Sequence, residues 1–189
     1  MADEFLGDRK KALEDSFFAK ENAKLVERLR TRKLAEQAEQ SLMQASGIRD
    51  TEILRKLVEL GIEADTWAAI SLVPLIEVAW ADGHIDPKER RAVLSAAEAS
   101  GLLPGTPGYE LLESWLAHRP DGRLIETWGE YIVALCANLG EAERHALAQE
   151  VLGRARSVAE SAGGILGMGN KVSPEEEVML SELKKAFES

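Results

Sequence analysis

Apolar residues recur along most of the chain at helical spacing, and no segment shows the apolar-polar alternation of a strand. They are dominated by Leu and Ala, which favour helices. Residues 8–45 contain neither Gly nor Pro and predict one long helix. Further helices are predicted near residues 51–60, 66–81, 87–100, 109–118, 123–139, 141–161 and 174–189. The pattern therefore predicts an all-α fold.

The segment 66–81 predicts a central helix that is apolar nearly all round and therefore surrounded by other helices. Asp65 stands directly before it and is expected to cap its N-terminus. Pro74 lies inside it and is expected to bend it, because proline lacks the amide hydrogen that a helix needs.

Two helix starts share one pattern. Asp86 and Ser173 each precede a proline, and each is followed three residues later by a glutamate, Glu89 or Glu176. A cap residue, Pro at the first helical position and Glu at the third form a capping box. The repetition is weak evidence for duplication, because helix starts use the same residues everywhere.

The chain divides into an N-terminal helical arm, residues 1–47, and an all-helical domain, residues 48–189. The apolar stripe of the arm fails as a strict heptad after Leu29, where Arg32, Glu36 and Glu39 occupy the seam. The arm is therefore expected to dock on the body or on a second copy of the chain. Gly47 is expected to end its helix.

Charge separates the two parts. Residues 1–50 carry ten basic and ten acidic residues, so the whole net charge of −10 belongs to residues 51–189. An acidic body repels nucleic acids and anionic membranes and suits cations or basic partners. We therefore expect no nucleic acid partner, although "RLRTRK" (28–33) is one basic cluster in the arm.

The longest apolar run, residues 67–81, is interrupted by Pro74 and Glu77 and is shorter than the roughly 20 residues that a bilayer requires. We expect no membrane span. The N-terminus has no apolar signal-peptide core, and Cys136 is the only cysteine. These features together predict a cytoplasmic protein.

The common catalytic motifs are missing from the sequence. It contains no His-Glu-x-x-His, Cys-x-x-Cys or Gly-x-Ser-x-Gly, and its three histidines are scattered. Cys136 lies in an apolar segment, where a packed thiol is expected rather than a nucleophile. We therefore expect a protein without enzymatic activity, and no catalytic or organic cofactor-binding residue is predicted.

The segment "WADGHIDPKE" (80–89) is open to two interpretations. With Gly83 at the sixth position of a calcium loop, acidic residues occupy positions five, nine and twelve, but the first and third positions are apolar. A divalent cation such as Ca²⁺ or Mg²⁺ would bind Asp82, Asp86 and Glu89. Alternatively, Asp82-Gly83 forms a turn and the other two acids form the capping box, with no ligand.

The stretch "VAWADGHIDPKERRAVL" (78–94) resembles the signature of TerB-like domains, found in the tellurite-resistance protein TerB and at the N-terminus of the co-chaperone DjlA. The resemblance covers about residues 65–187 and implies a bundle of about seven helices with an acidic surface. It also implies a cation site from Asp82, Glu89 and, in a second copy of the motif, Glu176. That second copy has Gly169-Asn170 where the family has Asp-Gly.

Two functional hypotheses follow. The first is an interaction or stress-response module of TerB-like type that binds a divalent cation at Asp82, Asp86, Glu89 and Glu176. The second is a structural protein without a ligand site, whose N-terminal helix mediates assembly. A protein partner or self-association through that helix is expected in both.

Overall fold

All regular secondary structure in the described part of the chain is helical. The computed structural model describes residues 2–162 and 172–188, and this part contains no strand. A long helix α1 (Ala2–Ser46) precedes a body of seven α-helices and one 3₁₀ helix, η1. The body comprises α2 (Thr51–Glu59), η1 (Trp67–Leu72), α3 (Val73–Ala79), α4 (Pro87–Ala99), α5 (Pro107–Ala117), α6 (Arg123–Cys136), α7 (Glu141–Ala162) and α8 (Pro174–Glu188). The predicted all-α bundle with an additional N-terminal helix is thus confirmed.

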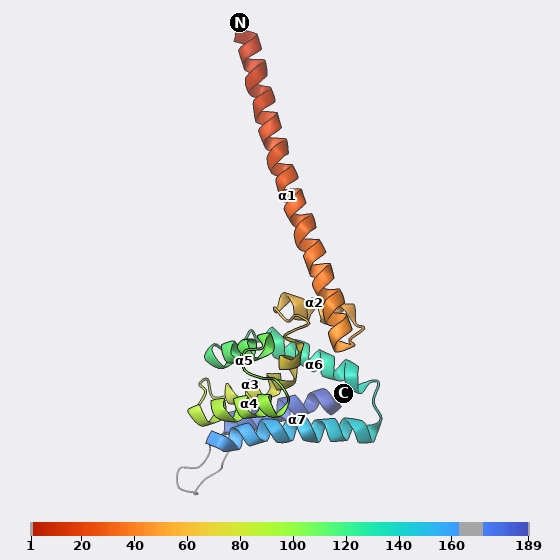
Figure 1. Ribbon diagram of the computed structural model, residues 1–189, viewed down its shortest axis with the longest axis vertical. Helices are drawn as coiled ribbons and strands as arrows, with labels where there is room; N and C mark the ends of the chain where they lie inside the picture. Colours follow the sequence, from red (N-terminus) through yellow and green to blue (C-terminus); the bar gives the residue numbers. More distant parts are fainter. Residues whose placement is uncertain (1, 163–171, 189) are drawn as a thin grey trace.

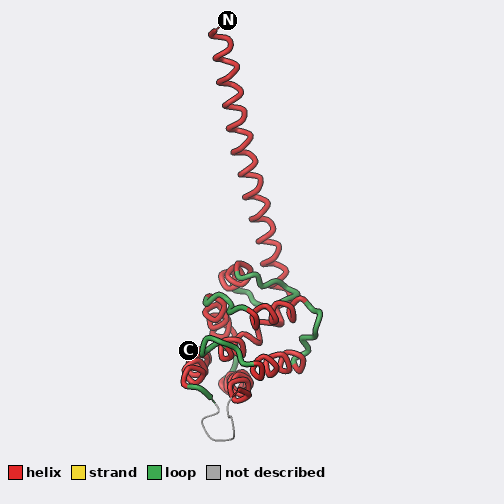
Figure 2. Tube along the Cα trace, turned by 90° about the vertical axis from the view of Figure 1, so that its left-hand side faces the viewer, coloured by secondary structure: helices red, strands yellow, loops and turns green. Residues whose placement is uncertain are grey.

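Helix α1 projects from the body as a straight arm (Figures 1 and 2). Its 45 residues correspond to about 67 Å at 1.5 Å per residue. Only its C-terminal end packs on the body, through a half-buried face that begins at Ala35 and includes the fully buried Leu42. The helix ends at Gly47, whose φ of 73° is the left-handed conformation that glycine adopts readily.

The central apolar segment differs from the expected single bent helix. It is divided into η1 and α3, and Pro74 occupies the first turn of α3. Proline cannot donate to the carbonyl four residues before it, so an α-helix cannot pass through this position, whereas the first turn needs no such donor. The prediction that Asp65 caps this helix was also wrong: the cap position is Thr66, without a side-chain hydrogen bond.

The remaining helix starts follow local sequence closely. Asp50 caps α2 by accepting from the backbone N–H groups of Glu52 and Ile53. Thr106 caps α5 through Tyr109 N–H. These contacts satisfy amide groups that have no partner inside the helix.

Helix α3 lies at the centre of the body, and every one of its side chains is buried. It packs against α6, α7 and α8, while α7 also lies along α4 and α8. Figure 1 shows α7 along the side of the body opposite the arm. The α3–α4 turn, which carries the acidic motif, leaves this buried helix for the surface, where Asp82, Gly83 and His84 are exposed.

Candidate functional site

The starts of α4 and α8 each form the complete capping box that the sequence predicts. At α4, the Glu89 carboxylate accepts from Asp86 N–H at 2.8 Å, and Asp86 accepts in return from the first turn. At α8, the Glu176 carboxylate accepts from Ser173 N–H, and the Ser173 hydroxyl accepts from Glu176 N–H at 3.2 Å. Both glutamates are only 5% exposed.

These two glutamates come from helix starts 87 residues apart and meet in the folded chain. The pKa of Glu89 is raised to about 7, above all by burial and also by a hydrogen bond with Glu176 and the negative charges of Glu176 and Asp82. The Asp86 N–H acts in the opposite direction. Two carboxyl groups in contact favour one proton between them, so the arrangement binds a proton near neutral pH.

Asp82 and Asp86 occupy different positions from the glutamate pair. The Asp82 side chain is exposed, accepts from His84 N–H at 3.1 Å and lies 3.1 Å from His84 Nδ1. Asp86 is half-buried and engaged in the cap of α4. Gly83, with φ of 92°, forms the turn between them. The turn interpretation of Asp82-Gly83 therefore describes the local backbone.

The donors available to a cation are carboxylate oxygens, which suit Ca²⁺ and Mg²⁺. Glu89 and Glu176 are in contact, and the charge of Asp82 acts on Glu89. However, among residues 2–162 and 172–188 no three His, Cys, Asp or Glu side chains converge so as to hold a metal ion. A cation at the glutamate pair would thus need water and a movement of Asp82 to complete its shell. Gly169-Asn170 lies outside the described residues.

A further acidic residue is buried in α3. Glu77 is 3% exposed, and its Oε2 lies 3.7 Å from Nη2 of Arg119, which follows α5. Burial raises the pKa of Glu77, although Arg119 acts to lower it. The apolar pattern marked Glu77 as unusual, but no local signal identifies a partner 42 residues later.

The residues considered for catalysis remain apart. Cys136 is buried in α6, as expected for a packed thiol. His84 contacts Asp82 in an exposed turn, His118 follows α5 and His145 lies on α7. Each belongs to a different element.

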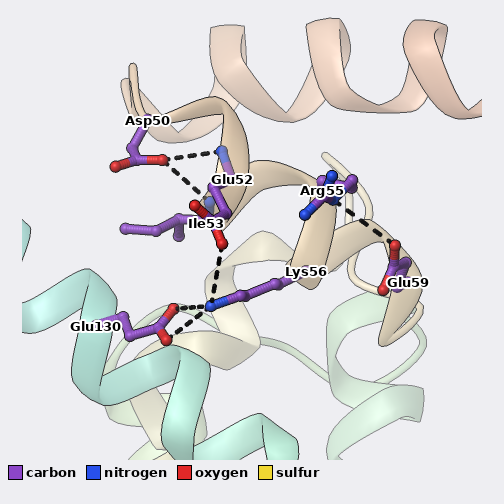
Figure 3. A network of polar contacts seen from close by, with 7 residues as sticks. All are labelled: Asp50, Glu52, Ile53, Arg55, Lys56, Glu59 and Glu130. Atoms are coloured by element: carbon purple, nitrogen blue, oxygen red, sulfur yellow. Dashed lines mark hydrogen bonds and ion pairs between the residues drawn. The ribbon is translucent and has the colours of Figure 1, made fainter.

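A polar network connects α2, which follows the arm, to α6 (Figure 3). Lys56 of α2 places its Nζ 2.7 and 2.8 Å from the two carboxylate oxygens of Glu130 on α6. Glu52 lies on the same side of α2, 3.8 Å from Lys56. Since α1 packs on α2, this contact fixes the helix that supports the arm.

The exposed part of α1 carries large apolar side chains. Leu25, Val26, Leu29 and Leu34 are each more than half exposed. Residues three or four apart lie on one face of a helix, so the first three form one surface, which we call the arm patch. Leu34 follows Leu29 by five residues and points to another side. The sequence predicted an arm that docks, but its exposure required the structure.

No family model, no curated protein and no solved structure matches this chain. Within the described residues, every helix is too short or too polar to span a bilayer.

Proposed function

We propose that this chain is a non-enzymatic interaction module of TerB-like type, in which a helical body presents α1 to a protein partner. The observation that carries the proposal is the arm patch, Leu25, Val26 and Leu29, held in solvent beyond the body. A helix that offers apolar anchors three or four residues apart is a common element of protein recognition. The arm is supported at its root by α2 and the Lys56–Glu130 contact.

Photo-crosslinking in cells tests this proposal. A photoreactive phenylalanine analogue replaces Leu25 in one chain and Leu34 in a matched control, since both are leucines of similar exposure on the same helix. A discrete protein adduct from position 25, and a much weaker one from position 34, supports docking on the arm patch. Absence of any adduct from both positions would contradict the proposal.

A second candidate function is binding of a divalent cation at Glu89 and Glu176, and the contact between these two buried glutamates favours it. A cation would replace the proton between the carboxyl groups and would remove the cost of burying two negative charges. Asp82, whose charge already acts on Glu89, is the nearest additional donor, while Asp86 is occupied by the helix cap. In this form the module would bind or release a divalent cation as the concentration of that cation around the protein changes.

Thermal unfolding of metal-stripped protein, titrated with Ca²⁺, Mg²⁺ and Mn²⁺ at pH 8, tests cation binding. A ligand at a hundredfold excess over its Kd stabilises the folded state by roughly 2.7 kcal/mol. The stabilisation should disappear in Glu89→Gln and persist in Glu177→Gln, a control on the exposed face of α8. No stabilisation at millimolar ion, or an equal effect in both variants, excludes this site.

We place the module in the cytoplasm. This assignment is supported by the single cysteine, Cys136, which is buried in the apolar core of α6 and forms no structural disulfide within the chain. A role in the response to stress agrees with the TerB-like resemblance and would be tested by the growth of a deletion strain under oxyanion and metal stress.

A further inference from the structure

We propose that the arm of one chain docks on the acidic outer face of α8 in a second copy of the same chain. This inference rests on the proposed function, in which α1 is the docking element, and identifies its partner. Three observations carry it: the arm cannot reach its own body, its exposed segment is basic, and α8 presents an acidic surface with an exposed apolar residue.

The arm is directed away from its own body in both views (Figures 1 and 2). It is one unbroken helix up to Ser46, and its contacts with the body begin only at Ala35. The arm patch lies about 9–15 Å beyond that point, counted at 1.5 Å per residue from Ala35 to Leu29 and Leu25. It also lies on a different side of the helix from the face that contacts the body. A continuous helix cannot fold back, so the chain's own body does not cover this patch.

The exposed segment of the arm is basic. Residues 20–33 contain six basic and two acidic residues, a net charge of +4. Arg28 follows Leu25 by three residues and Lys33 follows Leu29 by four, so both flank the arm patch. Neither has an ion-pair partner among the described side chains. A partner of this surface should be acidic, with an apolar centre.

The outer face of α8 has this chemistry. Val178 is 62% exposed, the most exposed large apolar side chain in the described part of the body. Glu175 lies one turn before it and Glu182 one turn after it, and both are exposed. Residues 174–183 contain no basic residue; Lys185 follows one turn after Glu182 and pairs with it, whereas no ion pair of Glu175 occurs among the described side chains. We call Glu175, Val178 and Glu182 the α8 patch.

Charge also argues against pairing of two arms with each other. Two segments of net charge +4 would face one another in such a pair, with Arg28 and Lys33 beside the apolar contact. Like charges across a contact are unfavourable, whereas the arm patch and the α8 patch are complementary. Exchange of arms between two chains would form the same contact twice and give a closed, two-fold symmetric dimer.

Sedimentation equilibrium of the full chain at increasing salt tests the inference. We expect a mass of about twice the 20.7 kDa of the chain at low salt, and dissociation as salt screens the attraction. Leu25→Gln/Leu29→Gln should be monomeric, and the matched Leu34→Gln should remain a dimer. Gln preserves helix propensity, and circular dichroism verifies that each variant is folded.

Charge reversal identifies the receiving face. Arg28→Glu/Lys33→Glu and Glu175→Lys/Glu182→Lys should each abolish the dimer, and the combination of all four changes in one chain should restore it. If the unmodified chain is still monomeric at about 100 μM, the inference is overturned. The inference is also overturned if dimerisation becomes stronger as the salt concentration rises, or if Glu175→Lys/Glu182→Lys leaves it unchanged. A monomer that still gives a heterologous adduct from position 25 overturns this inference and leaves the proposed function intact.

Discussion

Replacing Glu176 by Gln should stabilise the protein above neutral pH, although it alters a buried polar residue. The amide oxygen of Gln can still accept from Ser173 N–H, and its NH₂ group can donate to the Glu89 carboxylate. The variant therefore keeps the cap of α8 and removes one of two buried carboxyl groups. Most buried polar substitutions destabilise, so the direction of this effect is diagnostic.

The magnitude follows from the pKa of Glu89, which is raised from 4.5 to about 7. A raised pKa means that the folded state binds the proton more tightly than the unfolded state does. Proton binding by Glu89 therefore contributes fully to the stability of the folded state at or below pH 4.5, and this contribution is lost as the pH rises through 7. Since one pKa unit corresponds to about 1.4 kcal/mol, the loss is at most roughly 3 kcal/mol. Part of this loss comes from Glu176, and that part should disappear in the Glu176→Gln variant. The variant should then be more stable than the parent by about 1 kcal/mol or more at pH 8.

Urea unfolding followed by tryptophan fluorescence at pH 5, 6, 7 and 8 measures this difference. The Glu176→Gln variant should show a smaller decline in unfolding free energy from pH 5 to pH 8 than the parent. Glu177→Gln, a neighbouring exposed residue paired with Arg156, should change stability by less than about 0.5 kcal/mol at every pH. If Glu176→Gln is less stable than the parent at pH 8, the negative charges of Glu89 and Glu176 do not destabilise the folded state and the reasoning fails.

Three more predictions concern single residues of the body. Arg119→Met should lower the free energy of unfolding by about 1 kcal/mol at pH 8 and by little at pH 4, because it removes the cation that lowers the pKa of buried Glu77. Urea unfolding at the two pH values measures this, and equal losses at both would contradict the prediction. Gly101→Ala should destabilise by about 1 kcal/mol, because Gly101 has φ of 83°. Gly129 lies in the middle of α6, and a Cβ added there would meet no other atom within 4 Å. Gly129→Ala should therefore stabilise by about 0.5–1 kcal/mol, and the thermal midpoints of the two variants should move in opposite directions.

Local signals in the sequence predict most of the fold. Asp50, the Asp86–Glu89 box and the Ser173–Glu176 box all begin helices as their residue types indicate. Pro74 was correctly marked as a disturbance, but its effect was a division into two helices rather than a bend. Helix propensity indicates that proline interrupts a helix at this position. The packing of the neighbouring turns decides whether the helix bends or divides there.

Contacts between distant segments are less accessible from sequence. The repeated capping boxes alone did not place Glu89 and Glu176 in one site; only the resemblance of 78–94 to a known signature implied this, and in the structure the two glutamates are in contact. Nothing in the sequence connects Glu77 with Arg119, because their pairing depends on where the chain that follows α5 lies relative to α3. The exposure of the arm patch likewise depends on the direction in which α1 leaves the body.

The meeting of the two capping glutamates has a consequence for how the body opens. Each glutamate protects a backbone amide, Asp86 N–H or Ser173 N–H, and each is protected from water by the other. If the first turn of α8 frays, Glu89 becomes solvated and the start of α4 loses its neighbour. These two amides should therefore exchange with deuterium in a single cooperative opening. Two segments far apart in the chain would then form one dynamic unit whose opening rate depends on pH.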